Sequence, residues 1–191
     1  MTKIFVIDNG GQWTHREWRT LRYLDVDTKI IQNTTPVKEI LNEKVNGLVL
    51  SGGSPRIGLE GNLGNCAEIL DKVEIPIIGI CAGHQFIARH YGGKVEPSKI
   101  PEFGKVELII FEKDPIFNNI VKKSIVWESH NDEVTKIPNN FINLANSENC
   151  EIQIIKHKDK SLYGFQFHPE VEHTEYGIQF FKNFIKLCES N

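Results

Sequence analysis

The sequence lacks the features that mark membrane, secreted and nucleic-acid-binding proteins. No stretch approaches the roughly 18 consecutive apolar residues of a membrane-spanning helix, and the amino terminus shows no signal-peptide pattern. Charged residues make up 25% of the 191 residues and the net charge is -3, so the chain also lacks the basic surface that nucleic acid or an acidic membrane would require. We therefore expect a cytoplasmic protein with neither nucleic acid nor a membrane as a partner.

Cysteines are few, and their spacing excludes two common roles. The four are Cys66, Cys81, Cys150 and Cys188. None of them forms a C-x-x-C pair, so the spacing indicates neither a disulfide framework nor a zinc site. We predict no metal in this chain. Apolar helix faces favour a packing role for Cys66 and Cys188, whereas Cys150 has no obvious partner.

The pattern of apolar residues predicts one domain, residues 1–191, of the α/β class. In the first half, short apolar runs alternate with helical patterns, which favours a largely parallel sheet with helices on both faces. The second half reads as strands joined by short polar links, which adds an antiparallel strand region to this mixed sheet. Strands are expected at 3–7, 28–31, 47–50, 77–80, 106–111, 124–129, 141–145, 152–156 and 162–167, and helices at 13–24, 35–41, 63–73 and 174–188, the last capped by Thr174.

The most informative stretch is Pro76–Gln85, in which an apolar run leads to a cysteine and then to a helical pattern. Glycine stands two residues before and two residues after Cys81, at Gly79 and Gly83. This is the pattern of a nucleophile elbow, in which a tight strand-to-helix turn leaves no room for neighbouring side chains. The helix amino terminus would favour the thiolate. A buried structural cysteine is the competing interpretation of the motif by itself.

A second glycine turn, Ser51-Gly52-Gly53, follows the third expected strand and so lies at the same sheet edge as Cys81. Its N–H groups could form an oxyanion hole with the N–H of Ala82. A pyrophosphate-binding loop is rejected because Ser54-Pro55-Arg56 stands where acidic and hydroxyl groups should follow. A plain turn that needs positive φ remains open for this motif alone.

The segment that starts at Gln166 supplies candidates for a base and its orienting carboxylate. His168 and Glu170 are two residues apart, so they share a face if the strand stays extended through Pro169. A capped strand end and an exposed charge are the competing interpretations. Together with Cys81 they provide the nucleophile, base and orienter of one mechanism. We expect His84 to lie on a helix surface and His130 to lie in a loop near a partner interface.

Two motifs, residues 79–85 and 166–171, resemble the two signatures of the class I glutamine amidotransferases, and the resemblance spans the chain. Residues 8–12, 127–134 and 173–177 are similar to the branch of that family that serves GMP synthetase as a separate, archaeal-type glutaminase subunit. The resemblance implies a flavodoxin-like fold and the hydrolysis of glutamine to glutamate and ammonia.

The resemblance also implies roles for individual residues. Cys81 would form a glutamyl thioester, His168 would act as base and then acid, and Glu170 would orient His168. Gly53 and Ala82 would donate the oxyanion N–H groups. The glutamine pocket would be lined by Gly52, Gln85, Ser129, His130 and Asn131. Ser54, Ala82 and Asn131 depart from the residues common in the family, but no triad member is lost.

The implied partner is a separate ATP-pyrophosphatase subunit that activates XMP to make GMP. ATP and magnesium would bind to that partner, and this chain would hold no cofactor. Alternatives are a stand-alone glutaminase, a γ-glutamyl hydrolase, a glutaminase subunit that serves another synthase, or a regulatory module without turnover.

Overall fold

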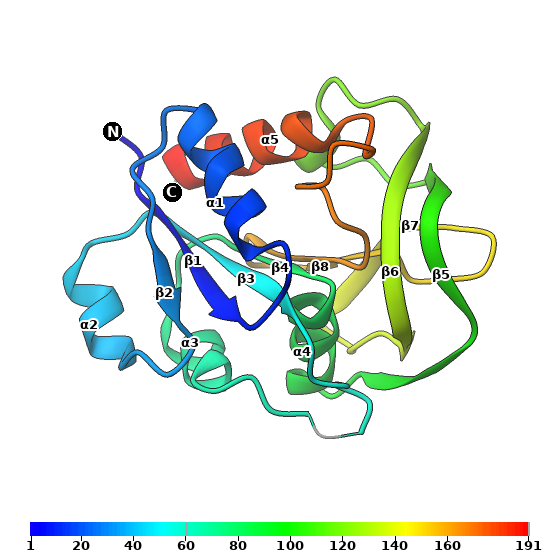
Figure 1. The fold of residues 1–191 in the computed structure, drawn as a ribbon, viewed down its shortest axis with the longest axis horizontal. Coiled ribbons are helices and arrows are strands. Elements are labelled where there is room, and N and C mark those ends of the chain that lie inside the picture. The colour runs from blue at the N-terminus through cyan, green and yellow to red at the C-terminus, as the bar shows by residue number, and fades with distance from the viewer. Residues whose placement is uncertain (60, 191) are drawn as a thin grey trace.

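A single nine-stranded sheet runs through the computed structural model, which describes residues 1–59 and 61–190 (Figure 1). The strand order is β2-β1-β3-β4-β9-β8-β7-β5-β6. Neighbours from β2 to β9 are parallel, and those from β9 to β6 are antiparallel. The strands are β1 (Ile4–Asn9), β2 (Ile30–Gln32), β3 (Gly47–Gly53), β4 (Ile77–Ile80), β5 (Lys94–Ile110), β6 (Lys123–Lys136), β7 (Phe141–Asn146), β8 (Ile154–His157) and β9 (Leu162–Phe165). The predicted parallel core and antiparallel region are both confirmed, and the parallel part has the flavodoxin-like order.

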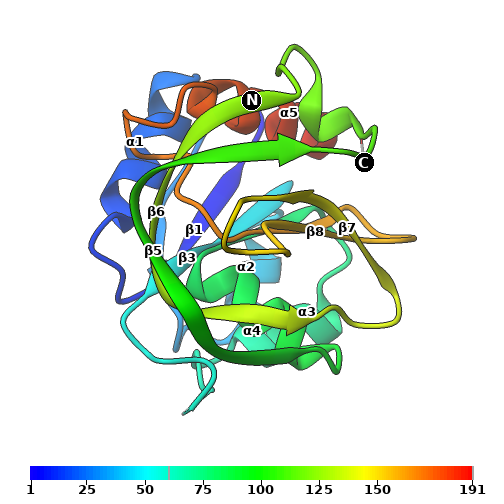
Figure 2. The same cartoon turned by 90° about the vertical axis from the view of Figure 1, so that its right-hand side faces the viewer.

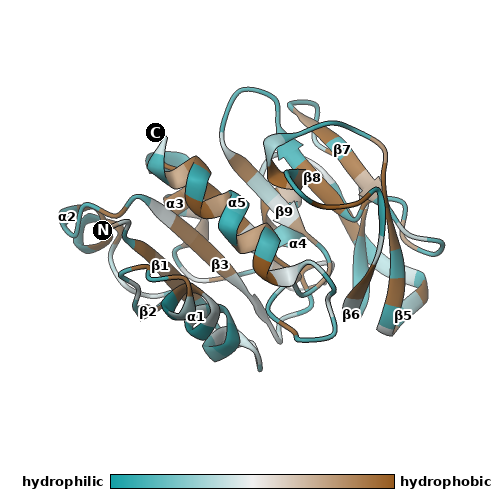
Figure 3. Cartoon of the chain, turned by 90° about the horizontal axis from the view of Figure 1, so that it is seen from above, coloured by the Kyte–Doolittle hydropathy of each residue, from teal (hydrophilic) through white to brown (hydrophobic). Residues whose placement is uncertain are grey.

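Helices cover both faces of the parallel part, as predicted. Side chains alternate along β1: Ile4 and Val6 join the core under α1 and α5, whereas Phe5 and Ile7 join the core under α2, α3 and α4. Figures 1 and 3 show α1 and α5 on one face of the sheet, and Figure 3 shows that β1 and β3 are hydrophobic over much of their length. The helices are α1 (Thr14–Tyr23), α2 (Val37–Asn42), α3 (Cys66–Lys72), α4 (Ala82–His90) and α5 (Gly177–Glu189), with a short 3-10 helix at Pro115–Phe117.

Strands β5 and β6 form a long curved ribbon at one side of the molecule (Figure 2). The expected strands at 106–111 and 124–129 are only parts of it, because β5 has 17 residues and β6 has 14. A register shift between Pro97 and Glu102 interrupts the pairing. The prediction of a loop at His130 is therefore wrong: His130 lies within β6, and the strand alternation turns it inward.

Two other boundaries differ from the predictions. The last helix begins at Gly177 rather than at Thr174, because the Thr174 hydroxyl donates to the His168 carbonyl (2.7 Å) and accepts from the Trp127 N–H (3.0 Å). Strand β9 ends at Phe165, before the His168 segment. Among the described residues, no helix is long and apolar enough to cross a membrane.

Candidate active site

Cys81 occupies the turn between β4 and α4, as the elbow motif predicts. Its φ of +50° and ψ of -105° lie outside the regions that side chains favour, so the turn is strained. A Cβ on Gly79 would lie 2.6 Å from the backbone carbon of Gly83, and a Cβ on Gly83 would overlap the carbonyl oxygen of Leu50. Both glycines are therefore required by close packing of backbone.

The sulfur of Cys81 is placed at the amino terminus of α4, where the helix dipole favours negative charge. The thiol donates to the Ser129 carbonyl at 3.7 Å, and the Gln166 amide nitrogen lies 3.8 Å from the sulfur. Gln166 was not among the predicted site residues. Its position just ahead of His168 in the second family signature is the signal that could have identified it.

His168 and Glu170 form the predicted pair, although no strand holds them. The imidazole Nδ1 lies 2.6 Å from Glu170 Oε1, and both residues are buried. Burial alone lowers the pKa of His168, but the charges of Glu170 and Cys81 outweigh it and hold that pKa well above its usual value. Gly52 lies between base and nucleophile: a Cβ there would be 3.4 Å from the imidazole Cε1 and 3.7 Å from the Cys81 Cβ.

Residues distant in sequence hold the His168 backbone and ring. The His168 N–H donates to the Trp127 carbonyl (2.9 Å), and Thr174 bridges the same two residues. The Trp13 ring meets the imidazole edge-on, with 4.4 Å between centroids. These contacts fix His168 beyond the end of β9 at Phe165.

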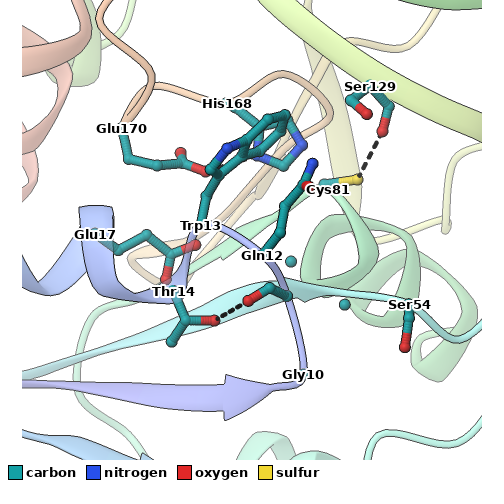
Figure 4. A pocket seen from close by; sticks show the side chains of 13 residues that line it. Gly10, Gln12, Trp13, Thr14, Glu17, Ser54, Cys81, Ser129, His168 and Glu170 are labelled. Carbon is teal, nitrogen blue, oxygen red and sulfur yellow. Dashed lines mark hydrogen bonds and ion pairs between the residues drawn. The ribbon is translucent and has the colours of Figure 1, made fainter.

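Two cavities meet at Cys81 (Figure 4 shows the larger). The larger, about 260 Å³, lies on the α1 side and the smaller, about 110 Å³, on the β6 side. The larger is lined by Gly10, Gly11, Gln12, Trp13, Thr14, Glu17, Gly52, Gly53, Ser54, Cys81, Ser129, His168 and Glu170. The smaller is lined by Gly53, Ser54, Pro55, Arg56, Cys81, Ala82, Gln85, Phe103, Ser129, His130, Asn131 and Asp132.

The residues predicted for the oxyanion hole lie together with Cys81. Gly53 and Ala82 both line the smaller cavity, and Ala82 is the first residue of α4, where N–H groups have no partner within the helix. A Cβ on Gly53 would lie 2.6 Å from the Asn9 carbonyl oxygen, so glycine is needed there for close approach. Their role as oxyanion donors stays a prediction.

The residues predicted for the glutamine pocket separate into groups. Gln85, His130 and Asn131 line the smaller cavity, Gly52 lines the larger, and Ser129 lines both. The Gln85 amide is already engaged, because it donates to the Asp132 carbonyl (2.7 Å) and to Gln166 (3.1 Å).

The His130 imidazole points into the interior. It lies 3.1 Å from a carboxylate oxygen of Glu102 and 3.0 Å from the Asp132 carbonyl. Asp132 is buried and paired with Arg56. His130 lines the smaller cavity, but its imidazole is already engaged in hydrogen bonds and is not free to bind a ligand.

Ligand atoms of Glu102, His130 and Cys150 lie within 4.8 Å of one another. Glu102 already accepts hydrogen bonds from Ser147 (2.7 Å) and Gln153 (2.9 Å), besides its contact with His130. The donor set thus fits a buried hydrogen-bond network, and the absence of a metal from this chain stays a prediction.

His84 was expected on a helix surface, and this is wrong. The residue is fully buried against β9, where a Cβ on Gly164 would lie 2.6 Å from its Nδ1. Burial lowers the pKa of His84 to about 3, so the ring is neutral. His84 therefore has a structural role within the core.

The larger cavity includes residues that were not predicted for the site, among them Gln12, Trp13 and Glu17. The signal was available, because Trp13, Glu17 and Leu21 are four residues apart and so share one helix face. A carboxylate on that apolar face is the anomaly that marks the site.

Comparisons with known proteins agree with this geometry. Residues 5–188 match the family model described as glutamine amidotransferase class-I. A Thermoplasma acidophilum protein, named as one subunit of glutamine-hydrolyzing GMP synthase, is 49% identical over 191 residues, which cover 100% of this chain and 94% of that protein. The protein of the same name from Pyrococcus abyssi is 50% identical over 188 residues, which cover 97% and 98% of the two chains.

Solved structures share the fold. A Thermoplasma acidophilum crystal structure has a TM-score of 0.94 and 48% identity, and the match covers 100% of this chain and 95% of that one. A glutamine amidotransferase from Thermotoga maritima has a TM-score of 0.72 at 22% identity, covering 99% and 83%. The second likeness supports the architecture alone.

Proposed function

Because this chain belongs to the class I glutamine amidotransferase family, we propose that it is the glutaminase subunit of a two-subunit GMP synthase. The observation that carries the proposal is the elbow cysteine beside a buried His168–Glu170 pair. Identity near 50% along the whole chain to proteins that are named for GMP synthase supports the choice of pathway.

In the first half of the reaction, the Cys81 thiol gives its proton to His168 and the sulfur attacks the amide carbon of glutamine. Glu170 is hydrogen-bonded to Nδ1 of His168, and its negative charge stabilises the imidazolium that forms. The N–H groups of Gly53 and Ala82 would hold the oxyanion.

In the second half, His168 returns the proton to the leaving nitrogen. The C–N bond breaks, ammonia departs and a glutamyl thioester remains on Cys81. Water then attacks the thioester carbon, with His168 taking its proton, and glutamate and the free thiol are released.

The ammonia acceptor is proposed to lie on a separate ATP-pyrophosphatase subunit, which would bind ATP, magnesium and XMP. Relatives of this chain are themselves named as one subunit of their enzyme, which supports the existence of a second. A cytoplasmic location stays a prediction.

The test is glutamate release from glutamine by the purified chain, alone and with the synthetase subunit of the same organism plus XMP, ATP and magnesium. We expect low release alone, stimulation by the complete mixture and none with Cys81→Ala. If the chain releases glutamate at the full rate by itself and XMP does not change that rate, the catalytic triad remains supported. The assignment to GMP synthesis is then overturned in favour of a stand-alone glutaminase or another ammonia acceptor.

A further inference from the structure

Two buried carboxylates in the larger cavity each leave an oxygen without a hydrogen-bond donor. Glu17 is 1% exposed and Glu170 is 6% exposed, and the Oε2 atom of each is buried and unpartnered. In Figure 4 the two side chains extend from α1 and from the loop after β9 toward the same part of the cavity. A buried oxygen without a donor costs about 1–3 kcal/mol or more. The site therefore suits a small ligand that is rich in N–H or O–H donors.

The position of His168 indicates which part of the bound glutamine faces the larger cavity. His168 lines the larger cavity, whereas Gln85 and Asn131, predicted to hold glutamine, line the smaller one. The leaving nitrogen must face His168, because that imidazole protonates it. On the proposed function, ammonia is thus released on the side where Glu17 and Glu170 lie.

We propose that Glu17 and Glu170 form a retention site for the released ammonia. The Glu17 carboxyl gives its proton to the ammonia nitrogen, and the ammonium ion donates N–H groups to the free oxygens of both carboxylates. Return of that proton to Glu17 breaks these contacts and releases neutral ammonia, the form that can act as a nucleophile. This inference rests on the proposed function and adds a product site to it.

The environment of Glu17 favours the protonated form of its carboxyl group. Burial, and then the charge of Glu170, raise the pKa of Glu17 well above its usual value. Asp8 acts in the same direction, whereas His168 and the Gly52 backbone lower that pKa. A neutral Glu17 beside an ionised Glu170 can give its proton to ammonia, and the ammonium ion then lies between two ionised carboxylates without any change in the total charge of the site. The 260 Å³ cavity far exceeds the roughly 30 Å³ that a water-sized molecule occupies.

The test measures binding without turnover, in the Cys81→Ala chain. Thermal unfolding is followed with ammonium chloride and, at equal concentration, with tetramethylammonium chloride, whose cation has no N–H group. At about five times the dissociation constant we expect ammonium to raise the Tm by about 2–4 °C more than tetramethylammonium does. Glu17→Gln should abolish this difference, since it removes the acidic proton and places a donor in the site.

Glu39→Gln is the matched control, because Glu39 is exposed on α2. It should keep the full ammonium effect, and Glu17→Asp, which keeps the carboxyl group but withdraws it from the cavity, should reduce the effect in a chain that still folds. An equal Tm rise with both salts would overturn the proposal. An ammonium effect that is still present in the Glu17→Gln variant would overturn it as well, and either result would mean that the cavity holds no specific ammonium site. Glutamate release by the unmodified chain separates the two claims: release without an ammonium effect refutes the retention site alone, whereas absent release refutes the glutaminase.

Discussion

The nucleophile and the base are positioned by different means. The elbow around Cys81 is shaped by its own backbone, with glycines at positions 79 and 83 in close contact with neighbouring main chain. His168 follows the end of β9 and is held by a hydrogen bond to Trp127 and a ring contact with Trp13, both far away in the sequence, and by the nearby Thr174. Changes at the elbow should therefore damage folding or abolish chemistry, whereas changes around His168 should reduce the rate by degrees.

The largest effect is expected at Cys81 itself. Cys81→Ala should remove glutamate release altogether, because no other thiol of the described residues lines the two cavities. Cys81→Gly should be equally inactive but more stable than Cys81→Ala by about 1 kcal/mol, because glycine relieves the strain at φ +50°. Urea unfolding of both variants checks the second point, and an alanine variant as stable as the glycine variant would contradict the strain.

The next effect concerns the packing of the elbow. Gly83→Ala should lower the free energy of unfolding by about 2–3 kcal/mol, because the new Cβ meets the Leu50 carbonyl. Gly104→Ala is the control: its φ is +93° but the space around it is open, so only backbone strain of about 1 kcal/mol is expected. Equal losses in the two variants would mean that close packing is not what requires glycine at the elbow.

His84 joins the two regions, since it lies on the elbow helix and packs against β9, which leads to His168. Its folded pKa of about 3 lies below the unfolded value of about 6.5. The unfolded chain therefore binds one more proton in this window, and stability falls by about 1.4 kcal/mol per unit as pH drops from 6.5 toward 3. His84→Gln cannot titrate, so its stability should fall less steeply; parallel curves for the two proteins, measured by urea unfolding, would refute this.

The smallest effect is expected at the support of the base. Thr174→Val keeps the shape of the side chain but removes the hydroxyl that bridges His168 and Trp127. We expect kcat for glutamate release to fall about 5–10-fold with little change in KM, equivalent to about 1 kcal/mol. Thr20→Val, which removes an exposed hydroxyl bond to the Arg16 carbonyl, should leave kcat unchanged. A fall of about 1000-fold or no fall at all would contradict graded support.

The same contrast explains what could be predicted from the sequence. The elbow follows from local spacing, so Gly79, Cys81 and Gly83 were assigned correctly with the strand and helix on either side. The His168–Glu170 pair was also found, although it was expected on a strand that ends at Phe165.

The errors fall where distant residues compete for a group. Thr174 looks like a helix cap, but its hydroxyl is used by His168 and Trp127. His130 looks like a loop residue, because its inward partner Glu102 lies 28 positions away on β5. Neither contact can be read from spacing along one segment.

The burial of the cysteines also bears on how preparations of this protein can be measured. Burial raises the pKa of Cys66 to about 12 and also raises the pKa values of Cys150 and Cys188, so these thiols are poor nucleophiles while the chain stays folded. Among the cysteines, all of which lie in the described part of the chain, Cys81 is the one that lines the two cavities. A small alkylating reagent should therefore modify one equivalent per native molecule, as intact-mass measurement can verify, and all four cysteines after unfolding. The extent of rapid labelling would then count the competent active sites in a sample.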